Sequence, residues 1–372
     1  MFKIYRRIRG AIILRPAPTG NRHIFGKAWF MVSLVPYLSE LWLSLIAFFL
    51  LYYAAVDGVV LGIGMLSLVN PDEKERDLMM GAVLSTWHSN QTWLVIVGGM
   101  MFGAFPLFYG VLLSALYIPV FGMLFGFIIR GVALDFWAEA SRKRPWELAF
   151  GLGSLLTSVA EGCALGGLLG GIHVKQGRFA GGLMDWATPF GACITVGVIL
   201  GFLMLAANFM VAKTEGRLQQ RGYRYAQASS LLTLLISFCT YAWLLARHPH
   251  LRERWTDAPA AFYVLPFPAL ALLCFLALFY CLWKRYEKAP LLLNVAIIIF
   301  SFTGISLGFY PHMIPNVLGE AVTAPAAAAA PQTLIFMLTV VGIALPVILA
   351  YTSYEFWVFR GKISDYYKKN EE

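Results

Sequence analysis

"LWLSLIAFFLLYYAAVDGVVLGIGML", residues 41–66, decides the fold because it contains a single charged residue, Asp57. A helix rises about 1.5 Å per residue, so about 20 apolar residues are enough to cross the hydrocarbon core of a bilayer. A helix also satisfies its own backbone hydrogen bonds in lipid. The stretch therefore predicts a membrane-spanning helix, which we expect over residues 36–65.

Similar apolar stretches recur along the whole chain. Of its 372 residues, 59% are hydrophobic and 13% are charged, and the mean hydropathy is +0.69. Soluble domains carry about 25% charged residues, and the short alternating pattern of a transmembrane barrel is missing. We therefore predict an all-α polytopic membrane protein with about nine transmembrane helices. The expected spans are 36–65, 91–113, 115–138, 148–171, 188–212, 227–246, 261–283, 290–313 and 333–357.

The basic residues between these spans predict the orientation of the chain. Sixteen lie in alternate connections and the C-terminal tail: Lys74, Arg76, Arg142, Lys143, Arg144, Lys213, Arg217, Arg221, Arg224, Lys284, Arg285, Lys288, Arg360, Lys362, Lys368 and Lys369. Five lie in the opposite connections: Lys175, Arg178, Arg247, Arg252 and Arg254. Because loop Lys and Arg favour the cytoplasmic side, the C-terminus is predicted inside and the N-terminus outside. The net charge of +9 is spread over these loops, which argues against a nucleic-acid partner.

The first 30 residues differ from the rest of the chain. They carry seven basic residues but no apolar region with a cleavage site, so they are not a secretory signal. We predict a basic N-terminal extension at 1–30 and a nine-helix membrane domain at 31–372. A true start at Met31 stays open as the alternative.

Asp57 and Glu161 are acids well inside expected spans, where a charge costs several kcal/mol. Asp57 is a candidate for carrying protons or binding a cation. A hydrogen bond to a neighbouring helix, or a position at the headgroup level, would also explain it. Glu161 lies in "SVAEGCALGGLLGG", residues 158–171, where small residues let helices approach closely. It therefore needs either a partner or a proton.

Arg130 and Asp135 share the segment "IIRGVALDFW", residues 128–137. Five residues separate two side chains by about 140° around a helix, which is a poor geometry for pairing. We expect each to face a different partner. The alternatives are an irregular helix at Gly131 and snorkelling to the interface.

The histidines and cysteines indicate no cofactor bound by this chain. A haem-carrying bundle needs histidines deep in facing helices. His23, His173, His248, His250 and His312 fall in loops or near span ends, and only His88 begins a membrane segment. The five cysteines lie in apolar runs without a CxxC pair, and no P-loop or zinc-protease motif occurs.

Six motifs, in order, resemble subunit II of the cytochrome bd-type quinol oxidases, from about Met31 to the end of the chain. They are "DGVVLGIGML" (57–66), "WHSNQTWLVIVGG" followed by "AFPLFY" (87–99 and 104–109), "RGVALDF" (130–136), "KTEGRLQQR" (213–221), "GFYPHMIPN" (308–316) and "LAYTSYEFWVFRGKI" (349–363). The resemblance implies a multi-pass protein of the bacterial inner membrane.

The resemblance also implies a partner that carries the cofactors. In this family a haem-bearing subunit I, with b-type and d-type haems or b-type haems only, oxidises quinol and reduces dioxygen to water. Subunit II ligates no haem and contributes a cytoplasm-facing proton path at the subunit interface. Some members hold a structural quinone or a small single-helix accessory subunit, and membrane lipid surrounds the complex.

The resemblance assigns the proton path residue by residue. The channel acids of the family correspond to His88 and Asp135, and its first-helix acid corresponds to Asp57. Trp87, Asn90, Gln91, Trp93 and Arg130 match the pattern as supporting or interface residues. The sequence departs from the family at His88 (usually Asp), Ser89 (usually Gly) and Val60 (Asp in many members).

His88 is the departure with the clearest chemical consequence. An imidazole accepts and releases protons near neutral pH, so His88 is a candidate proton-uptake group. Equally open is a lost path, or one rerouted through Glu161. The rival function for the whole chain is a small-molecule or ion permease with intramembrane carboxylates.

Overall fold

The computed structural model describes residues 35–84, 87–315, 320–358 and 361–363. Contacts separate Met1–Leu38 from Ser39–Glu372. In the first unit, the described part is the short 3-10 helix η1 (Val35–Tyr37) and Leu38. The predicted extension over 1–30 lies outside the described residues. Everything below concerns the second unit.

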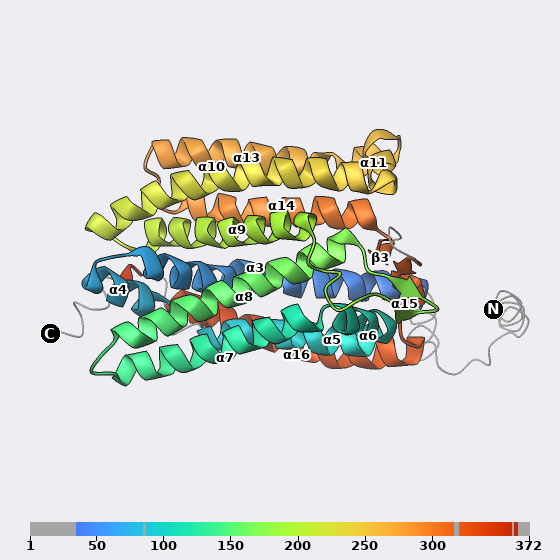
Figure 1. Cartoon of the computed structure of the whole chain (residues 1–372), viewed down its shortest axis with the longest axis horizontal. Coiled ribbons are helices and arrows are strands. Elements are labelled where there is room, and N and C mark those ends of the chain that lie inside the picture. Colours follow the sequence, from blue (N-terminus) through green and yellow to red (C-terminus); the bar gives the residue numbers. More distant parts are fainter. Residues whose placement is uncertain (1–34, 85–86, 316–319, 359–360, 364–372) are drawn as a thin grey trace, which may run out of the picture. The chain divides into compact units, whose positions relative to one another are not determined.

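Helices build nearly all of the second unit (Figure 1). The long ones are α3 (Leu38–Val69), α7 (Tyr117–Glu139), α8 (Arg144–Gly170), α9 (Pro189–Lys213), α10 (Gly216–Arg247), α13 (Pro266–Trp283), α14 (Ala289–Phe309) and α16 (Pro331–Val358). The shorter ones are α4 (Glu73–Leu84), α5 (Trp87–Ala104), α6 (Pro106–Ala115), α11 (Pro249–Thr256), α12 (Ala260–Val264) and α15 (Ala324–Ala327). Two antiparallel strand pairs complete the described chain: β1 (Val174–Lys175) with β2 (Arg178–Phe179), and β3 (His312–Ile314) with β4 (Val322–Thr323).

The predicted all-α membrane fold is confirmed. Within the described residues, eight helical segments are long and apolar enough to cross a membrane, judged by length and composition. The segment expected at 91–113 is divided into α5 and α6 at Phe105. Pro106 explains the break, because its ring removes a backbone N–H and favours the first position of a new helix.

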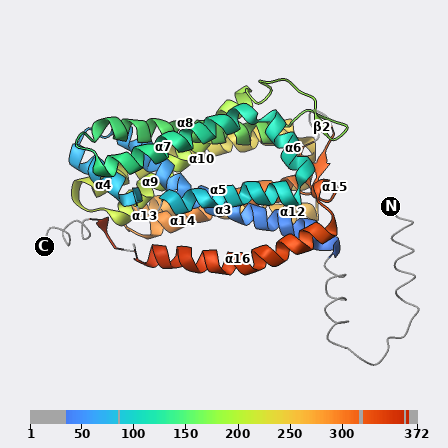
Figure 2. The same cartoon turned by 90° about the horizontal axis from the view of Figure 1, so that it is seen from below.

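Successive helices pack as neighbours along the bundle. α7 pairs with α8, α8 with α9, α9 with α10, and α13 with α14 (Figure 1). α3 fits against α9 because Gly62 has no side chain: a Cβ there would lie 2.1 Å from the Phe202 carbonyl oxygen. Gly64 allows the same close approach to Ser154 of α8. Figure 2 shows α16 along one edge, where it contacts α5.

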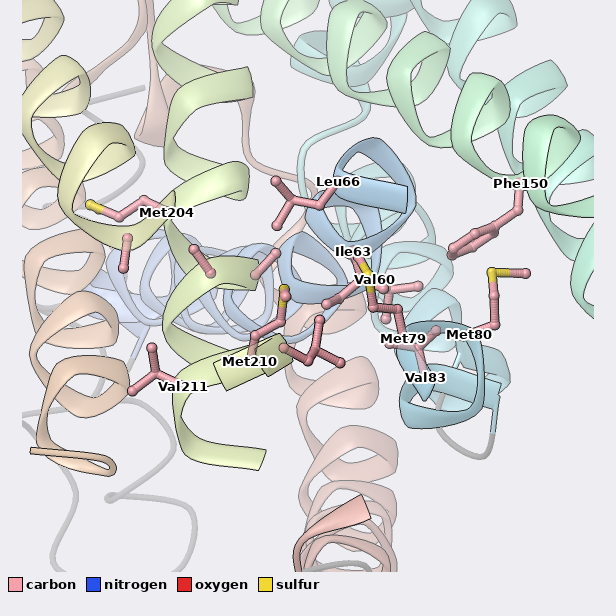
Figure 3. Packing of buried hydrophobic residues seen from close by; sticks show 14 of the residues in the cluster. Val60, Ile63, Leu66, Met79, Met80, Val83, Phe150, Met204, Met210 and Val211 are labelled. Carbon is pink, nitrogen blue, oxygen red and sulfur yellow. The ribbon is translucent and has the colours of Figure 1, made fainter. Parts of the chain in front are cut away.

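α4 occupies a segment that we expected to be a loop between spans. Met79, Met80 and Val83 are buried in a cluster with Ile63 of α3 and Phe150 of α8 (Figure 3). Burying such side chains stabilises a helix by about 1.5–3 kcal/mol for each one. α4 therefore forms through this packing, although its first turn is strongly charged.

Candidate functional site

A buried ion pair joins α3 to α7 within the membrane-spanning part. Nη2 of Arg130 donates to Oδ2 of Asp57 over 2.6 Å, and neither side chain has exposed surface. The guanidinium also lies 4.9 Å from the centroid of the Phe127 ring. Two opposite charges stabilise each other strongly in a low-dielectric interior, which makes their burial possible.

Small residues place Arg130 beside α3. A Cβ on Gly126 would lie 2.2 Å from the Thr157 hydroxyl oxygen, and one on Gly153 would lie 2.9 Å from the backbone nitrogen of Arg130. α7 and α8 therefore approach at backbone contact distance. This close packing brings the end of the Arg130 side chain to Asp57.

A second pair of polar groups lies one turn away. Tyr53 precedes Asp57 by four residues on α3, and its hydroxyl donates to Oε1 of Glu161 on α8. Tyr53 is buried and Glu161 is half-buried. Glu161 is close enough to Asp57 and Arg130 to interact with both electrostatically. Tyr53, Asp57, Arg130 and Glu161 therefore form one cluster, which we call the intramembrane quartet.

His88 and Asp135 form a separate pair on the surface. Nε2 of His88 lies 3.6 Å from Oδ1 of Asp135, and the two side chains are 70% and 57% exposed. Asp135 thus faces a different partner from Arg130, as the 140° separation predicts. α7 therefore carries polar groups on two sides: Arg130 lies inside the bundle and Asp135 lies on its surface.

The polar stretch at 87–93 forms the first two turns of α5. The helical period places its side chains on two faces, one buried and one exposed. Trp87, Asn90 and Trp93 face inward and are buried, while His88 and Thr92 are exposed. The Trp87 ring packs over Gly131, and the Trp93 ring lies 5.4 Å from that of Phe49. The tryptophans thus fix α5 against α7 and α3, and this places His88 beside Asp135. Gln91 is half-buried, and its amide nitrogen has no partner within the described residues.

A further polar cluster lies at the end of α3, where no sequence pattern predicted one. Nε of Arg76 lies 2.5 Å from Oε2 of Glu147, and Nη1 of Arg221 lies 3.0 Å from Oε2 of Glu75. Asn70 donates to Glu75 and accepts from Arg221. These residues, which we call the α4 clamp, join α3, α4, α8 and α10. The sequence identified Arg76 and Arg221 only as basic residues of loops. Arg76 and Glu147 are 71 positions apart, and Glu75 and Arg221 are 146 apart, so no local pattern predicts these contacts.

The described residues contain no group of three or more His, Cys, Asp or Glu side chains arranged to hold a metal ion. Five of the six histidines belong to this part of the chain. His88 lies in the first turn of α5, and His173, His248, His250 and His312 lie outside the membrane-spanning helices.

The sequence profile of cytochrome bd terminal oxidase subunit II matches residues 38–359. The chain belongs to this family. It is 26% identical to cytochrome bd-I ubiquinol oxidase subunit 2 of Escherichia coli K12 over 88% of this chain and 95% of that protein. It is 23% identical to cytochrome bd ubiquinol oxidase subunit 2 of Bacillus subtilis 168 over 88% and 97%. The bd oxidase structure from Geobacillus thermodenitrificans has the same fold, with a TM-score of 0.73 at 17% identity over 87% of this chain and 98% of that one.

Family membership confirms the resemblance found in the six motifs. The chain is a multi-pass protein of the bacterial inner membrane and a subunit of a terminal oxidase complex, with a subunit I as its partner. The rival prediction of a permease is not favoured, because the profile spans nearly all the described chain.

Proposed function

We propose that this chain is the subunit of a quinol:dioxygen oxidoreductase that ligates no haem and contributes a proton path at the subunit interface. The two relatives above are named as ubiquinol oxidase subunits. In the proposed complex, subunit I holds the haems, oxidises quinol and reduces dioxygen to water. This chain and subunit I form a heterodimer, which a small single-helix subunit joins in some members of the family.

The single observation that carries this proposal is the surface position of His88 and Asp135. Around them on α7, Ile128, Val132 and Phe136 are also exposed. A pair of ionisable side chains on such an apolar face is poorly stabilised by lipid. A partner subunit that covers this face would shield the pair and place it at the interface, where a proton path is needed.

The two groups have complementary chemistry for proton uptake. The His88 imidazole can take a proton from water at the cytoplasmic surface, and the Asp135 carboxylate can accept it. The arrangement separates this exposed pair from the buried intramembrane quartet. We assign proton uptake to His88 and Asp135, and assign to Arg130 the task of balancing the charge of Asp57 inside the bundle.

Glu161 extends the proposal toward the interior. It is the second acid in the quartet, and its hydrogen bond to Tyr53 gives it a neighbouring hydroxyl that can pass a proton. Oδ1 of Asp57 and two nitrogens of Arg130 have no partner within the described residues. Buried groups of this kind are commonly satisfied by internal water, which would connect the quartet to a path.

A structural quinone, present in some members of the family, would fit the groove between α3, α5 and α16. This groove has a volume of about 360 Å³ and is lined by apolar side chains that include Phe49, Met100 and Val340. The lining suits an isoprenoid tail. It offers no charged group to a quinone ring.

The test uses the purified two-subunit oxidase with ubiquinol as the electron donor. We expect His88→Ala and Asp135→Asn to slow oxygen consumption by about tenfold or more, because each removes a group that transfers protons. Thr92→Ala is the matched control, since Thr92 is exposed one turn from His88. Full activity with an unchanged pH profile in His88→Ala would overturn the assignment of His88.

A further inference from the structure

A basic cavity lies at the end of the bundle where α10 and α14 stop, on the side that the charge distribution assigns to the outside. Figure 1 shows α11 and β3 at this end. The cavity has a volume of about 530 Å³ and is lined by Arg247, His248, His250, Glu253, Arg254 and His312. None of these residues takes part in the proposed proton path.

The two arginines are held in place by backbone oxygens. Nε and Nη2 of Arg247 donate to the carbonyl oxygen of Gly170 over 3.2 and 3.1 Å. Nη1 of Arg254 donates to the carbonyl oxygens of Leu307 and Tyr310. Carbonyl oxygens fix the guanidinium groups without neutralising their charge. Glu253 is the one acid in the lining, and its Oε2 lies 3.6 Å from Nδ1 of His250.

The start of α11 adds partial positive charge to the same space. Pro249, His250 and Leu251 line the cavity, and the first backbone bond of the helix runs from the Arg252 N–H to the His248 carbonyl. The N–H groups of His250 and Leu251 precede that bond. No side chain caps this end in the described structure. Free N–H groups and the helix dipole favour an anion there.

The position of the cavity relative to the membrane indicates where the anion comes from. The apolar segments of α10 and α14 end at Arg247 and Phe309, which border the cavity. Tyr241, which precedes Arg247 on α10, packs against Trp255 of α11, with ring centroids 5.6 Å apart. Tyr and Trp are enriched at the level of lipid headgroups, so the cavity lies where phosphate groups of the membrane are present.

We propose that this cavity binds a phosphate group, carried by an anionic phospholipid headgroup or by free inorganic phosphate. Arg254 is the main recognition residue, because planar guanidinium groups donate paired hydrogen bonds to phosphate oxygens. His312, the first residue of β3, also lines the cavity and can donate a hydrogen bond to a bound anion.

The test compares purified oxidase complexes with two probes. Thermal unfolding is followed with added inorganic phosphate, and in nanodiscs of phosphatidylglycerol or phosphatidylcholine. We expect the wild type to gain stability from an anionic probe. Arg254→Gln should weaken apparent binding by about tenfold, as expected for one lost charge-assisted contact. Arg252→Gln is the matched control, because Arg252 is exposed on the same helix but does not line the cavity.

The probes also separate the two sources of phosphate. Stabilisation by phosphatidylglycerol alone identifies a lipid headgroup, and stabilisation by inorganic phosphate identifies a free anion. Since Arg254 also binds backbone oxygens, His312→Gln provides a second variant that leaves those contacts intact, and it should weaken the same probe. The proposal is overturned if neither probe stabilises the wild type, or if His312→Gln responds like Arg252→Gln.

Discussion

At the residue scale, the Asp57–Arg130 pair has the largest consequence for stability, because both side chains are fully buried. Asp57→Asn would leave the Arg130 guanidinium without its counter-charge. Removing one partner of a buried pair costs about 3–5 kcal/mol. We expect a clear drop in the thermal unfolding midpoint of the purified complex, with poor assembly as the extreme case.

The double variant Asp57→Leu with Arg130→Met separates structure from function. Removing both charges is nearly neutral for stability when the replacements pack well. If the pair only holds α3 to α7, stability and oxygen consumption should both return. If its charges act on the proton path, stability should return and activity should stay low. An Asp57→Asn variant as stable as the wild type would contradict the burial argument.

The sequence predicted that Asp57, Arg130 and Glu161 each need a partner, but it could not identify the partners. Asp57 and Arg130 are 73 positions apart, and Tyr53 and Glu161 are 108 apart. Such contacts depend on how α7 and α8 pack, which is set by glycines at 126 and 153. The polar residue missed in the quartet was Tyr53, whose one signal is its position one turn before Asp57.

At the element scale, the α4 clamp predicts that substitutions of Glu147 and Arg144, which lie three residues apart, differ sharply in their effect on stability. Glu147→Gln would leave Arg76 buried with a weaker partner, and we expect about 3 kcal/mol of destabilisation. Arg144 also contacts Glu147, at 3.2 Å, but its side chain is 47% exposed. Arg144→Gln should therefore change stability by less than about 1 kcal/mol. Equal shifts in the unfolding midpoints of the two variants would show that the clamp contributes little.

The sequence predicted the long helices better than the short ones. Apolar runs set the long spans, whereas α4 begins with "EKERD", residues 73–77, and resembles a charged loop. Its helix depends on burying Met79, Met80 and Val83 against distant partners. The start of α10 was missed for a similar reason, because the polar segment from Gly216 onward packs against α9 at Gly222.

The corner between α10 and α11 predicts a pH effect at the opposite end of the bundle. Nε2 of His248 lies 2.8 Å from the carbonyl oxygen of Leu169, near the end of α8. Burial lowers the pKa of His248 below its ordinary value of 6.5. The unfolded chain therefore binds this proton at a higher pH than the folded chain does. The stability that neutral His248 contributes is complete above about pH 6.5 and is lost as the pH falls below it.

This effect can be measured as the unfolding midpoint of the complex between pH 7.5 and 5.5. We expect His248→Asn to reduce the pH dependence of the free energy of unfolding by at most about 1.4 kcal/mol for each pH unit. His250→Asn is the control, because His250 is exposed. A pH dependence identical in wild type and His248→Asn would exclude the residue as its source.

At the scale of the whole molecule, ion pairs confirm that the connections predicted on one side do lie at one end of the bundle. Arg221 contacts Glu75 at 3.0 Å, and Lys143 contacts Asp77 at 3.0 Å. Nζ of Lys362, in the tail, lies 3.0 Å from Oε2 of Glu287 and 3.5 Å from Oε1 of Glu215, which directly precedes α10. Contacts of this length are impossible across a membrane of about 30 Å. The alternation of the connections was therefore predictable from the spacing of the spans alone.

Which end faces the cytoplasm remains a prediction from the distribution of Lys and Arg. We expect the end that carries α4 to be inside, since 16 of the 21 basic residues counted fall in the connections and tail that the sequence assigns to that side. Fusions to the complete oxidase test this. A fluorescent protein after Glu372 should be fluorescent, and alkaline phosphatase at the same position should be inactive. Alkaline phosphatase inserted at Gly177, in the turn between β1 and β2, should be active. The reverse pattern would place His88 and Asp135 on the wrong side to take protons from the cytoplasm. It would overturn the proposed path while leaving the family and the fold unchanged.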